Sequence, residues 1–197
     1  MATVANFPLS QIFLQKENTT LRSLSQILFG IVFLSVLARI SIPLPFSPVP
    51  LTGQTLGVFL ISLTFGRTRG SLTLLSYLGL GFAGFPIFSG GLSGLSGALF
   101  GPTFGYLIGM FAASIAMGSL ADRGFTKTFT QAFAASALGS VMIFSFGLFW
   151  LSFFVPKAVL LSAGLLPFVP GDLIKMTLAA SMVSTLRNAK AGLKAVS

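Results

Sequence analysis

Asp172 and Lys175 are the residues of this chain whose chemistry and position most need an explanation. The sequence holds only three acidic side chains, and Asp172 stands at the beginning of an apolar stretch, with Lys175 three residues later. On a helix, this spacing places the two side chains on the same face. Inserting each charge into hydrocarbon costs about 2.5–3.5 kcal/mol even on mild scales. We therefore expect the pair to face a ligand cavity rather than lipid.

Helix capping and an internal ion pair are the alternative explanations. Pro170 suits the first turn of a helix, where a carboxylate also bonds unpaired N–H groups and favours the helix dipole. Capping accounts for Asp172 alone, because a cation such as Lys175 in the first turn opposes the dipole. A structural salt bridge between the two therefore remains the alternative to a ligand role.

Four more residues are candidates for contacts with a ligand. Arg39 either extends its guanidinium to the membrane interface or binds a ligand carboxylate, which suits its fork geometry. Gln54 either pairs with backbone of the preceding proline-rich segment or faces the ligand. Phe88 and Tyr106 either pack in the interior or form aromatic walls for a ring-shaped ligand.

The composition indicates an all-α integral membrane protein. Hydrophobic residues make up 54% of the 197 residues and charged residues only 8%, against about 25% charged in soluble domains. Mean hydropathy is +0.94. Several apolar runs approach the roughly 20 residues that a helix needs to cross hydrocarbon, and the alternation typical of a transmembrane barrel is absent.

The residue inventory also excludes several functions. The chain has no cysteine and no histidine, so it offers no thiolate nucleophile, no zinc site of the usual ligands and no histidine acid–base catalyst. We expect no metal and no cofactor. The net charge of +9 comes from single basic residues between apolar runs, which is typical of membrane topology and not of nucleic-acid binding.

Six membrane-spanning helices are expected in one transmembrane domain, residues 21–187. They are placed at residues 21–40, 51–65, 71–83, 103–120, 129–154 and 170–186. Residues 1–20 form a cytoplasmic lead-in and residues 188–197 a cytoplasmic basic tail. Prolines 43, 45, 48 and 50 cannot continue a helix and predict an extended segment. The uncharged, glycine-rich stretch 84–106 is expected to surround a cavity.

The basic residues predict the orientation in the membrane. One side of the six-span arrangement receives Lys16, Arg22, Arg67, Arg69, Arg123, Lys127, Arg187, Lys190 and Lys194. The other side receives Arg39 and Lys157. This bias places both termini in the cytoplasm of a cell-membrane protein. Asp172, Lys175 and the proline-rich and glycine-rich segments then lie near the outer surface.

Four strings in the sequence resemble a known family. ISIPLPFSPVPLTGQTLGV, GRTRG, GFPIFSGGLSGLSGALFGPTFGYLIG and LPFVPGDLIKMTLA occur in this order from about residue 40 to 180. Together they resemble the biotin-specific S components of energy-coupling factor (ECF) transporters, the BioY family. The resemblance implies a six-helix S-component bundle that binds biotin near the outer surface. It also implies partners in the lipid bilayer and beneath it: a transmembrane coupling subunit and ATPase subunits. The chain itself would then be no enzyme.

The same resemblance implies roles for individual residues. Asp172 would accept a ureido N–H of biotin, and Lys175 would donate to the ureido carbonyl or pair with the carboxylate. The glycine-rich loop would close over the ligand, with Ser89 as a polar contact. S components generally dock through small residues spaced four apart on the first helix. That helix has Gly30, Ser35 and Ala38 here, without such a pair, so the docking surface is expected to differ.

Three other functions remain as alternatives. The first is an S component for another small vitamin, against which the complete LPFVPGDLIK string argues. The second is a small membrane enzyme acting on lipid, which would have to work with Asp172, Asp122 and Glu17 as its only carboxylates. The third is a permease that works alone, for which proton relays or inverted repeats would be expected.

Overall fold

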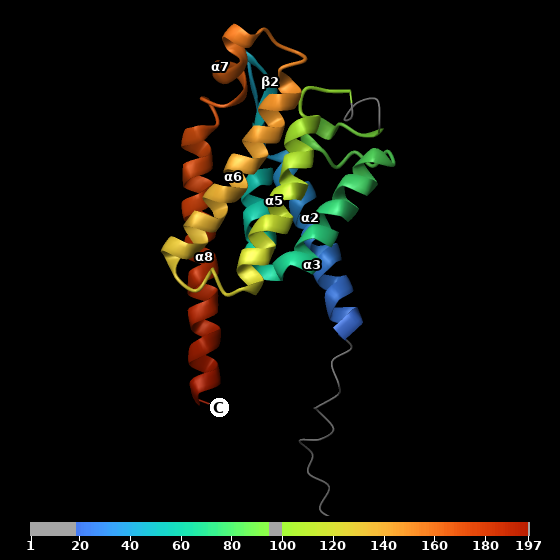
Figure 1. The fold of residues 1–197 in the computed structure, drawn as a ribbon. Helices are drawn as coiled ribbons and strands as arrows, with labels where there is room; N and C mark the ends of the chain where they lie inside the picture. Colours follow the sequence, from blue (N-terminus) through green and yellow to red (C-terminus); the bar gives the residue numbers. More distant parts are fainter. Residues whose placement is uncertain (1–18, 95–99, 197) are drawn as a thin grey trace, which may run out of the picture.

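Long apolar helices make up most of the computed structural model, which describes residues 19–94 and 100–196. They are α2 (Thr19–Arg39), α3 (Gln54–Phe82), α5 (Phe104–Asp122), α6 (Phe129–Leu151) and α8 (Val169–Val196). α5 packs against both α3 and α6, α2 packs against α3, and α8 packs against α6 and α3 (Figure 1). The expected lead-in 1–20 lies almost wholly outside the described residues, and α8 continues through most of the expected tail.

Among the described residues, four segments are long and apolar enough to cross a membrane. They are Thr20–Arg39, Phe104–Asp122, Phe129–Leu151 and Lys157–Arg187. Large apolar side chains cover their outward faces, among them Val32, Val141 and Phe149. Such continuous apolar surface is unfavourable in water. The chain is therefore a mostly helical, multi-pass membrane protein.

The second and third expected spans are parts of one helix, α3, which is kinked at Gly66. Gly66 has φ 76° and ψ −174°, a conformation open essentially only to glycine. Beyond the kink, the N–H of Arg67 donates to Asp122 Oδ2 at 3.0 Å. In Figure 1, α3 turns back at this point near the lower end of the molecule. The described part of the chain thus has five long helices where we expected six.

A small antiparallel sheet is the exception to the expected all-α architecture. β1 (Ser41–Leu44) pairs with β2 (Ser47–Thr52), with Ser41 opposite Thr52. The prolines of this segment exclude a helix, and both strands are edge strands, where a missing N–H is tolerated. The segment is extended, as the sequence predicts. The pairing of its two halves into a hairpin was not predicted.

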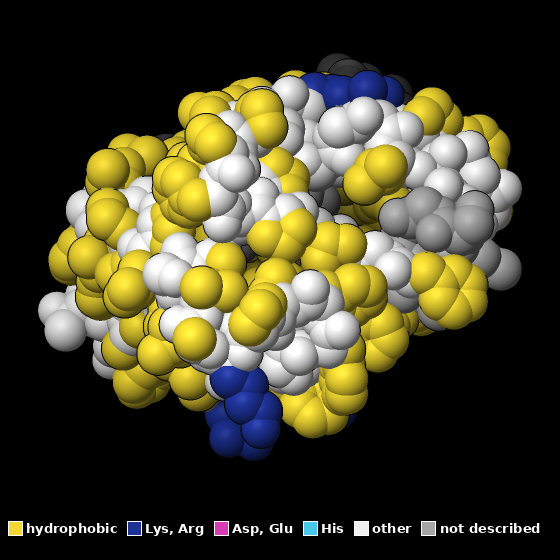
Figure 2. Space-filling view, turned by 90° about the horizontal axis from the view of Figure 1, so that it is seen from above, with side chains coloured by type: hydrophobic (Ala, Val, Ile, Leu, Met, Phe, Trp, Pro, Cys, Tyr) yellow, Lys and Arg dark blue, Asp and Glu magenta, His cyan; other side chains and the backbone are white. Residues whose placement is uncertain are grey.

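The connecting segments divide between the two ends of the bundle. The hairpin, the 3-10 turns η1 (Ser89–Gly91) and η2 (Lys157–Val159), and the short helix α7 (Leu160–Gly164) lie at the upper end in Figure 1. The α3 kink, the turn between α5 and α6, and the C-terminus lie at the lower end. Seen from the upper end, the surface is mostly hydrophobic or uncharged, with Lys and Arg at its edges (Figure 2).

Small residues of α2 pack inward against α3. Ala38 is fully buried, and a Cβ on Gly30 would press against the side chain of Thr73. The exposed side chains of α2 are large, for example Leu28, Val32 and Val36. The helix therefore uses its small residues for the internal packing of the bundle, and its outward face is broad and apolar.

Candidate ligand-binding pocket

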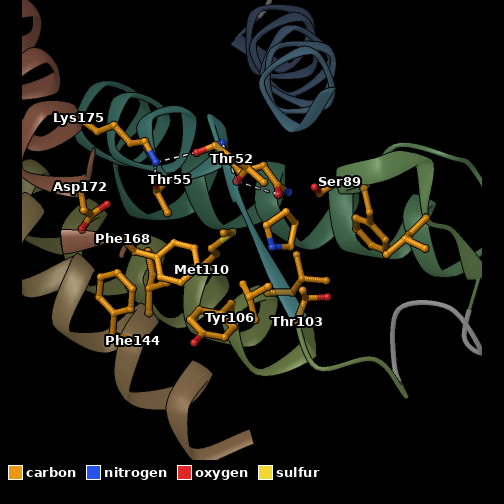
Figure 3. Close-up of a pocket in the computed structure, with 17 residues that line it drawn as sticks. Thr52, Thr55, Ser89, Thr103, Tyr106, Met110, Phe144, Phe168, Asp172 and Lys175 are labelled. Atoms are coloured by element: carbon orange, nitrogen blue, oxygen red, sulfur yellow. Dashed lines mark hydrogen bonds between the residues drawn. The ribbon is translucent and has the colours of Figure 1, made fainter. Parts of the chain in front are cut away.

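A pocket lies at the upper end of the bundle, between β2, η1 and the nearby ends of the long helices (Figure 3). It encloses about 740 Å³ of space not filled by atoms, its open mouth included. Its walls are mainly apolar and aromatic, with Val49, Met110, Ile143, Phe144 and Phe168 among them. All predicted site residues except Arg39 line this pocket.

Asp172 is a buried carboxylate on the first turn of α8. Its side chain is 3% exposed and accepts a hydrogen bond from the hydroxyl of Ser140 on α6. The backbone N–H of Asp172 bonds Phe168 O at 2.8 Å. Ser140 therefore fixes the carboxylate from the α6 side while the same carboxylate borders the pocket.

Lys175 reaches from α8 to the opposite wall. Its Nζ donates to Thr52 O at 2.6 Å and to Thr55 Oγ1 at 3.0 Å, as the dashed lines in Figure 3 show. An ammonium has three N–H donors. These bonds use two of them, and the third can serve a ligand in the pocket.

The two charged residues thus bond to groups of other elements instead of each other. Ser140 holds Asp172, and the Thr52–Thr55 segment holds Lys175. The structural alternative was a direct salt bridge between Asp172 and Lys175. The described residues do not form it. Both groups instead face the cavity with hydrogen-bonding capacity that a polar ligand can use.

Gln54 begins α3 and is 4% exposed. Its Nε2 donates to Tyr77 Oη at 2.8 Å, and Thr52 Oγ1 lies 3.4 Å from its Oε1. One expected role of Gln54 is pairing with the backbone of the proline-rich segment. The side chain pairs with a tyrosine of the same kinked helix instead, because the kink at Gly66 brings the two halves of α3 side by side.

The glycine-rich segment places Phe88 and Ser89 on the pocket wall. The Phe88 ring packs against Gly81, where a side chain would collide with it, and edge-on against Tyr77 with ring centroids 5.4 Å apart. Ser89 Oγ lies 2.8 Å from Ser41 Oγ of β1. Residues 95–99 of this segment lie outside the described residues.

Arg39 contacts the glycine-rich segment from outside the pocket lining. Its Nη2 donates to Pro86 O at 2.5 Å, and the guanidinium lies beside Gly91. Arg39 ends α2 and Ser41 begins β1, two positions later in the chain. Both residues therefore bond the segment that carries Phe88 and Ser89. The guanidinium is therefore placed to fasten this segment.

Tyr106 lines the pocket with its ring and ties down α7 with its hydroxyl. The hydroxyl donates to Gly164 O at 2.7 Å, and Ser47 Oγ donates to the adjacent Ala163 O at 2.6 Å. Of the two roles considered for Tyr106, packing is clearly present. The hydroxyl is occupied within the protein, so the aromatic ring is what Tyr106 offers to a ligand.

Sequence reasoning missed Ser140, Tyr77, Phe144 and Phe168. A serine or phenylalanine inside an apolar helix carries no local signal, because membrane helices hold many of both. Thr52 and Thr55 were noticed only as polar residues at the start of a short span. No cluster of three or more potential metal-binding side chains occurs among residues 19–94 and 100–196.

Known proteins resemble this chain over most of its length. The model of the BioY family matches residues 13–192. The "Biotin transporter BioY2" of Lactococcus lactis subsp. cremoris is 38% identical over 167 residues, which is 82% of this chain and 88% of that protein. The "Biotin transporter BioY" of Thermotoga maritima is 38% identical over 153 residues, 76% of this chain and 86% of the relative.

A solved structure shares the fold. It is described as the crystal structure at 2.1 Å of the S-component for biotin from an ECF-type ABC transporter. The TM-score is 0.79 at 27% sequence identity, over 87% of this chain and 94% of the other. The fold described above has therefore been observed by crystallography in another protein.

Proposed function

The chain belongs to the BioY family, and from this membership we propose that it is the biotin-binding membrane subunit, or S component, of an ATP-driven uptake transporter. It captures biotin outside the cell and delivers it to the cytoplasm. The observation that carries the proposal is the pocket itself, where Asp172, Lys175 and Gln54 meet apolar and aromatic walls. Charged, polar and aromatic side chains of this charge-poor chain meet there around a space that can hold a small, partly polar molecule.

Biotin matches the chemistry of these walls. Its ureido ring has two N–H donors and one carbonyl acceptor, and its fused ring and aliphatic chain are apolar. Asp172 accepts one ureido N–H, and the aromatic side chains of Phe88 and Tyr106 face the apolar parts. Ser89 adds a polar contact from the glycine-rich segment. A charge-assisted hydrogen bond in such a site contributes about 1.5–3 kcal/mol.

Lys175 and Arg39 are the two basic residues that could bind the carboxylate of biotin. Lys175 lines the pocket and retains a donor for either the ureido carbonyl or the carboxylate. Arg39 lies beyond the glycine-rich segment and fastens Pro86. We favour Lys175 as the ligand contact and Arg39 as the residue that secures the segment over the bound ligand.

The protein crosses the membrane six times in this proposal. The halves of α3 on either side of Gly66 count as two crossings, and α2, α5, α6 and α8 supply the others. The basic residues near the α3 kink and in the turn between α5 and α6 then lie in the cytoplasm, as do both termini. The pocket opens to the outside of the cell membrane.

Transport energy comes from separate subunits. The sequence contains no GK[ST] phosphate-binding loop, so ATP hydrolysis is assigned to ATPase partners that act through a transmembrane coupling subunit. The broad apolar face of α2 is available within the membrane for such a partner. No resident cofactor is needed, since biotin is the cargo.

Calorimetry on the purified full chain in detergent or nanodiscs tests the proposal. We expect saturable binding of biotin at one site per chain. Well-folded protein that binds no biotin would rule the proposal out. Excesses of other water-soluble vitamins should leave biotin bound. Displacement by one of them would identify a different cargo for the same fold.

A further inference from the structure

Tyr77 is buried in the second half of α3, outside the pocket lining, and is 1% exposed. Its hydroxyl stands between two hydrogen-bonding groups. Tyr77 Oη donates to the backbone oxygen of Ile87 at 2.9 Å and accepts from Gln54 Nε2 at 2.8 Å. It therefore joins the glycine-rich segment to a polar residue of the pocket wall.

The directions of these two bonds follow from the groups themselves. A backbone carbonyl can only accept, and a tyrosine hydroxyl has one proton to donate. When that proton goes to Ile87 O, the hydroxyl oxygen can only accept from Gln54. The amide of Gln54 must then turn its NH₂ group toward Tyr77, since its oxygen would face a second acceptor there.

The orientation of Gln54 determines what the pocket offers to a ligand. With its NH₂ group directed at Tyr77, the amide turns Oε1 away from the tyrosine. Within the described part of the chain, Oε1 accepts from the hydroxyl of Thr52 at the long distance of 3.4 Å. A 3.4 Å contact is weak compared with the usual 2.7–2.8 Å mode for hydroxyl donors, and an amide oxygen has two lone pairs, so Oε1 can accept a further hydrogen bond from a ligand.

We propose that Tyr77 is a positioning residue for ligand recognition: it locks the Gln54 amide so that Oε1 accepts an N–H from the bound ligand. This inference rests on the proposed function, which supplies a ligand with two ureido N–H groups. Asp172 accepts from one of them on the α8 side, and Gln54 accepts from the other on the α3 side. A ligand with a carbonyl or methyl group at the Gln54 position is rejected, because two acceptors or a steric clash would meet there.

A double-mutant cycle separates this role from a purely structural one. Tyr77→Phe removes the hydroxyl and keeps the ring against Phe88, while Gln54→Met removes the amide at similar volume. We expect Tyr77→Phe to weaken biotin binding about tenfold in the wild-type background, and less than twofold when Gln54→Met is already present. An equal loss in both backgrounds, or no loss in either, would overturn the inference.

Tyr106→Phe is the matched control. Its hydroxyl donates to Gly164 O and has no bond to Gln54, so its effect should be the same in both backgrounds. The melting temperature of each variant establishes that the fold is intact. If wild-type protein binds no biotin at all, the proposed function fails. If wild type binds but the cycle shows no coupling, only the role of Tyr77 fails.

Ligand analogues give a second readout that does not depend on the double-mutant cycle. Biotin methylated on one or the other ureido nitrogen loses one N–H at a time. Wild-type protein should reject both analogues, and Gln54→Met should recover tolerance for only one of them. Tyr77→Phe should relax discrimination toward that same analogue. Unchanged discrimination in Gln54→Met would refute the assignment of Oε1 as an N–H acceptor.

Discussion

Lys175 Nζ lies 2.6 Å from the backbone oxygen of Thr52, which joins the first turns of α8 to the last residue of β2. On the same face of α8, Asp172 is held by Ser140 of α6. The two charges therefore connect α8 to two different walls, and the pocket lies between those walls. An ion pair within α8 would have neutralised both groups and left the cavity without charged contacts.

Removing either charged group should weaken biotin binding strongly. Because a hydrogen bond to a charged group contributes about 1.5–3 kcal/mol, Asp172→Asn and Lys175→Ala should each lower affinity roughly 10-fold to 100-fold. Lys157→Ala is the control, since Lys157 is an exposed cation near the same end of the bundle. Calorimetry on the three variants makes the comparison, and equal affinities would contradict a ligand role for the pair.

Ser140→Ala should reduce affinity although Ser140 need not touch biotin. Without the hydroxyl, the carboxylate of Asp172 loses a partner that orients it, and we expect a loss of about threefold to tenfold, or about 0.7–1.4 kcal/mol. Ser136→Ala is a matched control, because Ser136 is buried one turn earlier on α6 and bonds only Ala132 O. Similar losses for both serines would indicate a general packing defect.

Arg39→Ala should accelerate biotin release without changing which end of biotin the protein recognises. The guanidinium bonds Pro86 O, so its removal loosens the segment that carries Phe88 and Ser89. The dissociation rate should rise by the same factor for biotin and for biotinamide, which lacks the carboxylate charge. An effect confined to biotin would instead show that Arg39 binds the carboxylate.

Gly66→Ala should destabilise the protein, because alanine cannot adopt the conformation at the α3 kink without a strain of about 1–3 kcal/mol. The new methyl group would also collide with Asp122, which accepts the Arg67 N–H. Thermal unfolding in detergent should show a clear drop in the midpoint. Gly79→Ala on the same helix meets no atom within 4 Å and should leave the midpoint unchanged or slightly higher.

The membrane class and most helix positions could be predicted from composition and apolar run length. Those signals are local, since a helix that crosses lipid must be apolar over about 20 residues whatever its neighbours are. The merged α3 was not predicted, because Gly66 begins the short basic string GRTRG, which reads as a loop between two apolar runs. Whether such a glycine ends a helix or kinks it depends on contacts such as that of Arg67 with Asp122, 55 positions away.

The pocket residues also divide into those that could be predicted from the sequence and those that could not. Asp172, Lys175 and Gln54 were predictable as candidates because charged residues are rare in this chain and charged or amide groups cost free energy in an apolar setting. Ser140 and Tyr77 were not, since neither is unusual where it stands in the sequence. Arg39 was a candidate by charge alone, and its contact with Pro86 became visible only in the folded chain.

The sequence by itself determined that this is a membrane protein, where most of its long apolar helices lie and which few charged residues call for an explanation. Composition and spacing suffice for that, because lipid imposes the same requirement on every segment. Only the tertiary structure decided that Asp172 and Lys175 bond to groups of other elements instead of each other. Their partners come from α6 and from the end of β2, and no local spacing specifies which distant backbone oxygen or hydroxyl a side chain will meet.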